Sequence, residues 1–224
     1  MKKNHLLAGL CFFFSQALYA QAVKLAKSEL EAVNVSMSIE RLGGKEVVKV
    51  IMDTAVKKSD QPTYVRLKGI ELRNGTIELK VLSKLLPNAP DFARGFIGVA
   101  FRINSDNTKF ESIYIRPTNG RAEDQVRRNH ATQYFSYPDY SFQRLRDESA
   151  GQYESYADMG LNEWISLRIV VKDAQAKLFL NDNTQPALIV NDLKLGASGK
   201  GTIGLFVDNG TEGYFSDIKI LKEN

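Results

Sequence analysis

The stretch GFIGVAFRINSDNTKFESIYIRP, residues 95–117, contains two runs of alternating apolar residues on either side of the turn sequence NSDN. Apolar side chains alternate along 97–103 in the first run, and Ile113 and Ile115 do so in the second. A period of two is the pattern of a strand with one buried face, and Asp-Asn is a turn-forming pair. The stretch therefore predicts a β-hairpin that buries one face.

The same pattern recurs along most of the chain, with no strong helix pattern after residue 20. Gly, Asn and Asp separate short runs that read as strands. Ten or more short strands without intervening helices predict an antiparallel two-sheet β-sandwich with a core between the sheets. Besides 95–103 and 110–117, the expected strands are 46–52, 63–72, 75–82, 163–171, 176–181, 187–193, 201–208 and 213–221.

The N-terminus, MKKNHLLAGLCFFFSQALYAQA, has two lysines, an apolar run and small residues at Ala17 and Ala20. This is the pattern of a secretory signal peptide cleaved after Ala20, and the apolar run is short for a membrane span. We therefore expect a signal peptide at 1–20, one domain at 21–224, and a secreted or periplasmic protein without a membrane span.

The composition of the expected mature chain excludes several kinds of site. Removing Lys2 and Lys3 leaves 28 basic and 26 acidic residues, a formal charge of +2, which is too balanced to indicate nucleic-acid binding. The lone cysteine is removed with residues 1–20, and one histidine, His130, is left. Thiol chemistry and a multi-histidine zinc site are therefore excluded.

The outward face of the predicted hairpin is the first candidate for a binding surface. The alternation places Gly98, Ala100 and Arg102 on that face of one strand, and Tyr114 and Arg116 on the same face of its partner. Cross-strand neighbours on one face interact, and the small residues are expected to leave room above the sheet. The face is either an ordinary solvent surface or the floor of a cleft.

The segment 118–162 is long, polar and without a clear run of alternating apolar residues. Structureless segments of this length in a compact domain are usually functional or disordered. Disordered segments are poor in aromatic residues, whereas this one is rich in them. Every basic residue from 110 to 171 except His130 is arginine, whose planar fork stacks on rings and binds carboxylates or hydroxyls. The segment is expected either to cap one end of the sandwich or to wall a ligand site. Its aromatic residues from 134 onward are Tyr134, Phe135, Tyr137, Tyr140, Phe142, Tyr153 and Tyr156.

Four stretches carry a family resemblance: LRNGTIELKV (72–81), FIGVAFRINSDNTKFESIYIRP (96–117), NEWISLRIVVKDAQAKLFLND (162–182) and GTIGLFVDNGTEGYFSDIKI (201–220). In this order they resemble the concanavalin A-like, or laminin G-like, jelly-roll superfamily across about residues 33–221. Within this superfamily, the sequence is most similar to the variant found in the 3-keto-disaccharide hydrolase-type domains of secreted bacterial proteins. The resemblance implies a two-sheet jelly roll and sugar ligands.

The catalytic and metal motifs of the superfamily's well-known members are absent from the sequence. The paired-glutamate strand motif of family sixteen glycoside hydrolases does not occur, nor do the Gln-x-His and Tyr-x-Lys-x-Gly strands of the alginate-lyase-like members. We expect no cofactor and no metal site. A structural calcium held by Asp182, Asp208 and Asp217 is the alternative to their role as ordinary turn residues.

Glu111 lies two residues before Ile113 on the same expected strand, so its carboxylate is expected to point inward, as Ile113 does. A buried carboxylate needs a partner, so an ion pair with arginine is expected. The alternative is a general acid/base, with Glu123, Asp124 or His130 as its partner.

These patterns together favour a secreted carbohydrate-binding jelly roll that engages an oligo- or polysaccharide through one sheet face and the 118–162 loop. Two alternatives stay open: a glycoside hydrolase or lyase that uses Glu111, and a non-catalytic protein-interaction module. The candidate ligand contacts are Arg102, Tyr114, Arg116, Tyr134 and Trp164.

Overall fold

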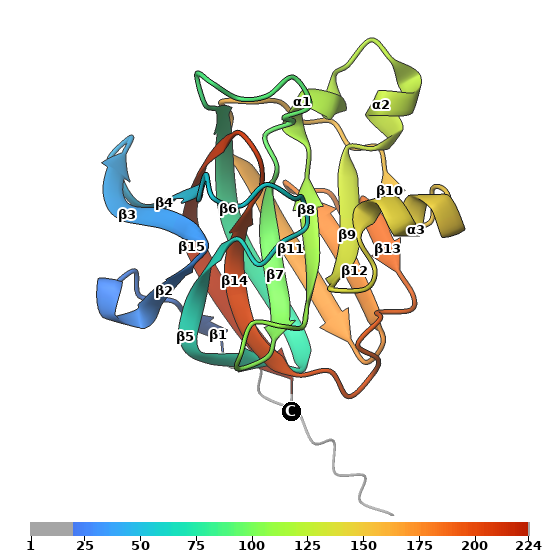
Figure 1. The fold of residues 1–224 in the computed structure, drawn as a ribbon. Coiled ribbons are helices and arrows are strands. Elements are labelled where there is room, and N and C mark those ends of the chain that lie inside the picture. Colours follow the sequence, from blue (N-terminus) through green and yellow to red (C-terminus); the bar gives the residue numbers. More distant parts are fainter. Residues whose placement is uncertain (1–19, 224) are drawn as a thin grey trace, which may run out of the picture.

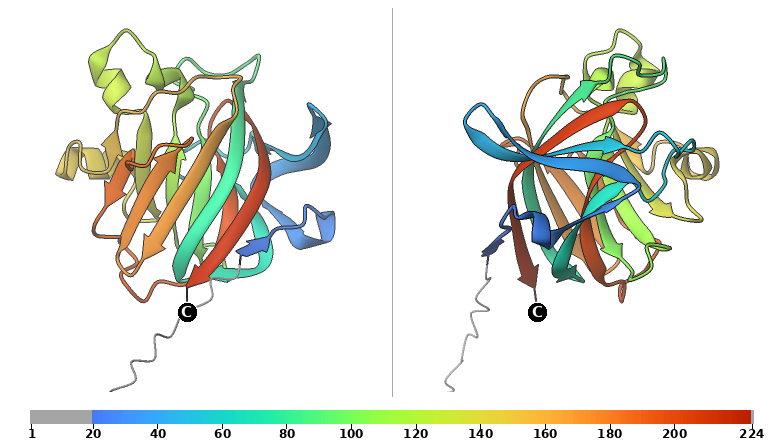
Figure 2. Two further views of the ribbon diagram at one scale, coloured as in Figure 1. Left: turned by 180° about the vertical axis from the view of Figure 1, so that it is seen from behind. Right: turned by 60° about the vertical axis from the view of Figure 1, so that its left-hand side comes forward.

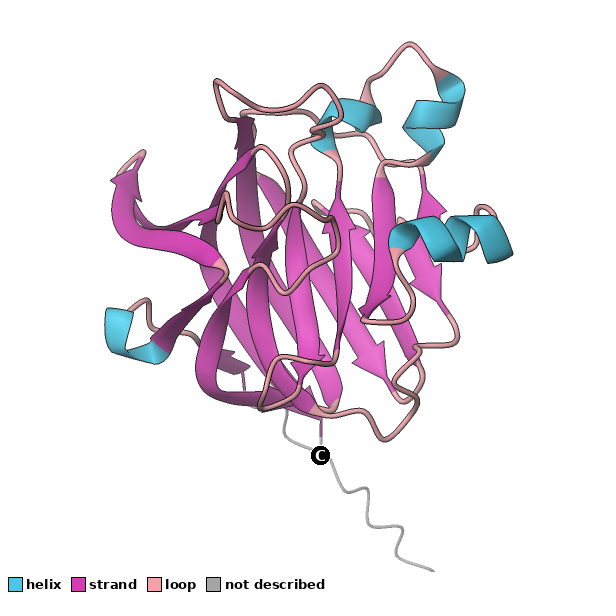
Figure 3. Cartoon of the chain, viewed as in Figure 1, coloured by secondary structure: helices cyan, strands magenta, loops and turns pink. Residues whose placement is uncertain are grey.

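Two antiparallel sheets pack face to face in the computed structural model, which describes residues 20–223 (Figures 1 and 3). The first, here called sheet A, has the strand order β13-β12-β11-β6-β15-β4-β3, and β1 also pairs with β15. Its strands are β1 (Ala20–Ala22), β3 (Val35–Leu42), β4 (Lys45–Met52), β6 (Asn74–Leu85), β11 (Ile165–Lys172), β12 (Gln175–Leu180), β13 (Leu188–Val190) and β15 (Thr211–Glu223).

The second sheet, sheet B, has the order β10-β9-β8-β7-β14-β5-β2. Its strands are β2 (Leu30–Val33), β5 (Tyr64–Leu72), β7 (Ile97–Ile103), β8 (Phe110–Ile115), β9 (Thr132–Tyr137), β10 (Glu154–Ser155) and β14 (Gly201–Val207). Strands that follow one another in the chain often lie in different sheets, as β6 and β7 do. Such connections from one sheet to the other are typical of a jelly roll. The two views of Figure 2 show the layers from behind and from the side.

All ten predicted strands exist, and the predicted sandwich is confirmed. Their apolar faces meet between the sheets, where Val99 and Phe101 of β7 and Ile77 of β6 are fully buried. Transfer of this apolar surface from water is the main stabilising contribution of such a core. The predicted signal peptide lies outside the described residues except for Ala20.

The segment 118–162 is ordered into short elements. These are α1 (Pro117–Gly120), α2 (Gln125–Asn129), β9, α3 (Phe142–Glu148) and β10, while a 3₁₀ turn at Lys27–Glu29 precedes β2. Asp124 caps α2 by accepting a hydrogen bond from the Arg127 N–H, and Ser141 caps α3 in the same way. Helices α1 and α2 lie beyond the end of β8, and α3 lies beside β9 (Figure 1).

The outward face of sheet B is an apolar layer rather than a solvent surface. The rings of Tyr64, Phe110, Tyr114, Phe135 and Phe206 lie on it with edge-on or tilted contacts between centroids 5.3–5.9 Å apart, and all five are buried. The β4–β5 connection crosses in front of this layer (Figure 1).

The expectation that small residues leave open space above the sheet is therefore wrong for most of this face. A Cβ on Gly98 would lie 2.5 Å from the Tyr114 Cα, and one on Gly204 would lie 2.8 Å from the Tyr64 ring. The missing side chains make room for these aromatic residues and leave none for a ligand.

Candidate functional site

The outer face of sheet B is hollowed at one end, where β7, β8 and β14 meet the helices. This cavity, here called the sheet B cavity, has a volume of about 590 Å³. Its apolar lining is Phe92, Phe96, Tyr114, Val126 and Phe142. Its basic lining is Arg94, Arg116, Arg127, His130 and Arg146.

The floor of the cavity is the Tyr114–Arg116 pair at the end of β8. Arg116 Nη2 donates a hydrogen bond of 2.8 Å to the Tyr114 hydroxyl, and its Nη1 donates to the His130 carbonyl at 3.2 Å. The guanidinium carbon lies 5.2 Å from the Tyr114 ring centroid and 5.3 Å from that of Phe142, close enough for cation–π attraction. Arg116 is therefore held rigidly, with 4% of its surface exposed.

Three of the lining residues, Arg116, His130 and Arg146, share a charge network with the buried carboxylate of Glu154, which is not itself in the lining. Arg146 donates to both oxygens of this carboxylate, with a shortest distance of 2.6 Å, and His130 Nε2 lies 3.1 Å from it. Arg116 lies 3.8 Å away. Burial, together with the charges of Arg146 and Arg116, holds the pKa of His130 below its usual value, although Glu154 opposes this shift.

Two further arginines reach the cavity with neutral partners. Arg127 donates from Nε to the Asn119 side-chain oxygen at 2.9 Å and from Nη2 to the Thr118 hydroxyl at 2.9 Å. Arg94 donates from Nη1 to the backbone carbonyls of Asp91 and Ala93. Within residues 20–223, no carboxylate lies within 4.0 Å of either guanidinium.

A pair of buried carboxyl groups lies at the cavity edge, Asp208 in the lining and Asp60 next to it. One Asp60 oxygen accepts the Phe142 N–H at 2.5 Å, and Asp208 accepts the Asp60 N–H at 3.0 Å. Burial raises the pKa of Asp60 to about 7 and that of Asp208 to about 6. The second oxygen of Asp60 has no hydrogen-bond partner among the described residues, which agrees with a protonated carboxyl.

Arg102, Glu111 and Tyr134 form a separate buried cluster inside the sandwich. Arg102 has a φ of 55° and does not continue the alternation of β7, so the prediction that it shares a face with Tyr114 is wrong. Its guanidinium pairs with Glu111 at 3.2 Å and donates to the carbonyls of Arg73, Asp173 and Gly196.

Glu111 also accepts hydrogen bonds from the Tyr134 hydroxyl at 2.9 Å and from the Leu195 N–H at 3.0 Å. The expected inward ion pair is therefore present. Neither Glu111 nor Arg102 has an exposed side chain, and neither lines the sheet B cavity. Asp124 and His130, two of the partners expected for Glu111, do line it.

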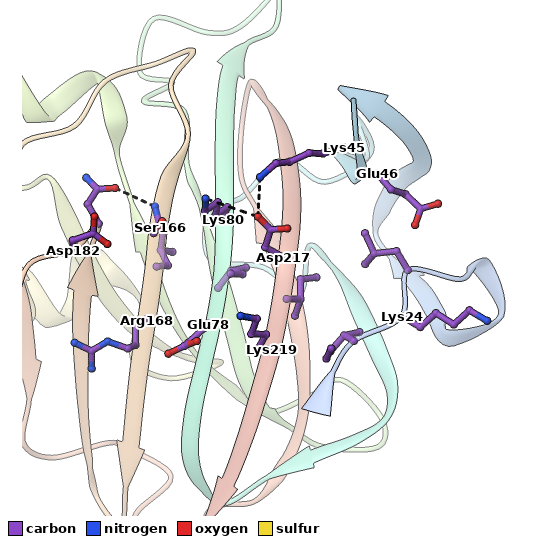
Figure 4. A pocket seen from close by; sticks show the side chains of 17 residues that line it. Lys24, Lys45, Glu46, Glu78, Lys80, Ser166, Arg168, Asp182, Asp217 and Lys219 are labelled. Atoms are coloured by element: carbon purple, nitrogen blue, oxygen red, sulfur yellow. Dashed lines mark hydrogen bonds and ion pairs between the residues drawn. The ribbon is translucent and has the colours of Figure 1, made fainter. Parts of the chain in front are cut away.

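Trp164 lies on sheet A, half-buried against a small cluster that contains Val47, Leu82 and Tyr214. Sheet A carries its own hollow, of about 870 Å³, shown in Figure 4. Asp217 in this hollow pairs with Lys45 at 3.2 Å and with Lys80 at 3.9 Å. Its charges of both signs neutralise one another, so the hollow offers little excess charge to a ligand.

The three aspartates considered for calcium do not converge. Asp182 and Asp217 line the hollow of sheet A, whereas Asp208 lies at the sheet B cavity. Across residues 20–223, no group of three His, Cys, Asp or Glu side chains is arranged to hold a metal ion. In the same part of the chain no helix is long and apolar enough to cross a membrane.

Solved structures share this architecture. A carbohydrate-binding module, CBM66, from Bacillus subtilis superposes with a TM-score of 0.57 at 13% identity, over 85% of this chain and 93% of the other. The chain has the concanavalin A-like jelly-roll fold. A Bacillus subtilis protein of unknown function with a galectin-like fold gives 0.54 at 10% identity, over 92% and 96% of the two chains.

A β-glucanase from Bacillus licheniformis gives a TM-score of 0.50 at 10% identity, over 94% of this chain and 100% of the other. No protein-family model matches the sequence, and no curated protein does. The comparisons thus confirm the predicted jelly-roll fold.

Of the five predicted contacts, Tyr114 and Arg116 line the cavity, while Arg102, Tyr134 and Trp164 do not. The sequence reasoning missed Phe92 and Arg94, which both lie in the connection between β6 and β7. Phe142, one of the aromatic residues noted in 118–162, is the first residue of α3 and lines the cavity. The use of arginine alone between 110 and 171 was the signal for Arg127 and Arg146. No pattern in the sequence indicated the Asp60–Asp208 pair.

Proposed function

We propose that the protein binds carbohydrate and that the sheet B cavity is its binding site. The supporting observation is the combination of aromatic rings with hydrogen-bond donors fixed in a hollow. Phe92, which is exposed at the rim, offers a flat apolar face to a sugar ring, and the arginine forks supply donors for its oxygens. The same fold occurs in a carbohydrate-binding module, which favours this class of ligand by analogy.

The cavity is largely formed before a ligand arrives. Arg116 and Arg146 are each held by a carboxylate or a hydroxyl and by the Phe142 ring. Binding therefore orders few side chains, which lowers the entropic cost of association. Phe92 differs, because it is 54% exposed at the rim and is free to close over a ring.

A glycan array followed by calorimetry tests the proposal. The purified chain is expected to bind a subset of glycans, and Phe92→Ala is expected to weaken that binding by about 1 kcal/mol, the size of an aromatic contact beyond its buried area. Tyr156→Ala is the matched control, because Tyr156 is an exposed aromatic residue outside the cavity lining. Absence of binding to every glycan would refute the proposal.

A second candidate function, glycoside hydrolysis, is favoured by Asp60 and Asp208 instead of Glu111. Raised pKa values of about 7 and about 6 suit a general acid at neutral pH. The test is incubation of a bound glycan with the wild-type chain and with Asp208→Asn. Release of shorter sugars by the wild type alone would favour the enzyme, and intact glycan in both would favour binding without catalysis.

A further inference from the structure

The balance of charges in the sheet B cavity points to a particular class of glycan. Four arginines line it, and the lining carboxylates are Asp124 and Asp208. Asp124 already accepts the Arg127 backbone N–H at 2.6 Å as the cap of α2. The Glu154 carboxylate is shared among Arg146, His130 and Arg116. The cavity therefore has an excess of positive charge.

This excess is concentrated at Arg94 and Arg127, which line the cavity together with Arg116. Both guanidiniums bond to neutral oxygens, those of backbone carbonyls, Asn119 and Thr118. Burial, and then the nearby charges of Arg127 and Arg116, lower the pKa of Arg94 below its usual value, although the charge of Asp91 opposes this shift. A group of like charges in a partly buried hollow is unfavourable without a counter-charge.

The donors that remain free determine what counter-charge fits. The bonds of Arg127 use Nε and Nη2, and those of Arg94 use Nη1. Arg127 Nη1 and Arg94 Nη2 make no hydrogen bond within residues 20–223. Guanidinium N–H groups of this kind bind carboxylate and sulfate oxygens through charge-assisted hydrogen bonds.

We infer that the ligand of the sheet B cavity is an acidic glycan, whose carboxylate or sulfate group binds between Arg94 and Arg127. This inference rests on the proposed function. The exposed side chains of Phe92 and Val126, 54% and 65% exposed, contribute apolar surface at the rim for the neighbouring sugar rings. The anion then sets the specificity, and the apolar surface adds affinity with little selectivity.

The test pairs acidic glycans with uncharged counterparts on one array and in calorimetry. Galacturonic acid oligomers are compared with their methyl esters, and sulfated dextran oligomers with plain dextran, within a wider panel of neutral and acidic polysaccharides. The expected result is binding confined to acidic glycans, weakening as salt rises because the contact is electrostatic. The uronate and sulfate arms show which anion is preferred.

Arg127→Gln provides the site-specific readout, and Arg128→Gln is its matched control on the same helix. Arg128 carries the same charge but donates to the Tyr156 hydroxyl outside the cavity lining. Arg127→Gln and Arg94→Gln are each expected to weaken binding about 10- to 100-fold, the usual loss for one charge-assisted contact. Arg128→Gln is expected to bind normally, and Arg127→Lys to lie in between because it keeps the charge and loses the fork.

Three results separate the possibilities. Acidic-glycan binding that falls in both cavity variants and not in Arg128→Gln supports the inference. Equal binding of neutral and acidic glycans, or unchanged binding by Arg127→Gln, overturns the inference and leaves carbohydrate binding standing. Failure to bind any glycan on the panel overturns the proposed function, and the inference falls with it.

Discussion

Arg102 and Glu111 form an ion pair of 3.2 Å in which neither side chain has any exposed surface. The carboxylate is also bonded by the Tyr134 hydroxyl and the Leu195 N–H, and the guanidinium by three backbone carbonyls. These carbonyls belong to chain segments on both sides of the sandwich. The pair therefore joins the two sheets through a buried polar network, in which only the Nε N–H of Arg102 has no hydrogen-bond partner among the described residues.

Arg102→Ala is expected to destabilise the fold by about 3–5 kcal/mol, because it leaves the Glu111 carboxylate buried without its counter-charge. Denaturant unfolding measures the loss. Arg121→Ala is the control, since Arg121 forms ion pairs with Asp158 and Glu163 on the surface, where such pairs contribute about 0–1 kcal/mol. Equal losses in the two variants would contradict the structural role assigned to Arg102.

The position of Arg102 shows where the alternation of residues along a strand no longer predicts which face a side chain lies on. Alternation predicted the buried faces of β7 and β8 correctly, because a period of two follows from the extended backbone itself. A positive φ at one residue breaks that period, and any residue type can be forced there by its surroundings. The φ of 55° at Arg102 moved its side chain from the outward face to the interior.

Gly98→Ala tests the tight contact between β7 and β8. The added Cβ would meet the Ile113 carbonyl oxygen and would lie 2.5 Å from the Tyr114 Cα. Both are backbone atoms of the paired strand, so the strand must shift. A loss of about 1–3 kcal/mol is expected, as for other overpacked sites.

Gly160→Ala is the comparison for Gly98→Ala in the same denaturant experiment. There the nearest atom to an added Cβ is Nη1 of Arg121, 3.0 Å away at the end of a flexible side chain. Little change in stability is expected. A Gly98→Ala variant as stable as Gly160→Ala would contradict the close contact between the backbones of β7 and β8.

Two of the strands missed by sequence reasoning differ in how readable they are. β9 has the sequence TQYFSY, in which Tyr134 and Phe135 are adjacent, so it has no alternating apolar run. β3 is an edge strand in which Val35, Met37 and Ile39 alternate with polar residues and are half-buried, so its pattern was present in the sequence. The residues that line the cavity come from separate strands, helices and loops, and their meeting is a property of the folded topology that no local pattern carries.

Tyr114→Phe tests the hydrogen bond at the cavity floor. The change keeps the ring and removes the hydroxyl that accepts from Arg116 Nη2 at 2.8 Å. Because the site is buried, the unpaired N–H is expected to cost about 1–3 kcal/mol of stability. Tyr156→Phe, at a tyrosine 44% exposed, is expected to cost much less, and similar losses in the two unfolding curves would argue against the bond.

The buried carboxyl of Asp60 predicts a stability that falls as pH rises. Its pKa is raised from 3.8 to about 7 in the fold, mainly by burial and also by Asp208, against the lowering effects of the Phe142 N–H, Arg116 and Arg146. A raised folded pKa means that the folded state keeps a proton that the unfolded chain releases. The stabilisation is therefore complete below about pH 4, and it is lost as pH rises towards 7.

Asp60→Asn isolates this contribution, because asparagine cannot ionise yet can still accept the Phe142 N–H. Relative to wild type, the variant is expected to become more stable between pH 4 and pH 8, by on the order of 4 kcal/mol if Asp60 titrates independently of Asp208. Asp158→Asn is the control. Asp158 is exposed and paired with Arg121, which lowers its pKa, so its difference from wild type should stay flat over the upper part of that range. Unfolding curves measured at each pH decide the matter, and a constant difference between Asp60→Asn and wild type would show that Asp60 is ionised in the fold throughout.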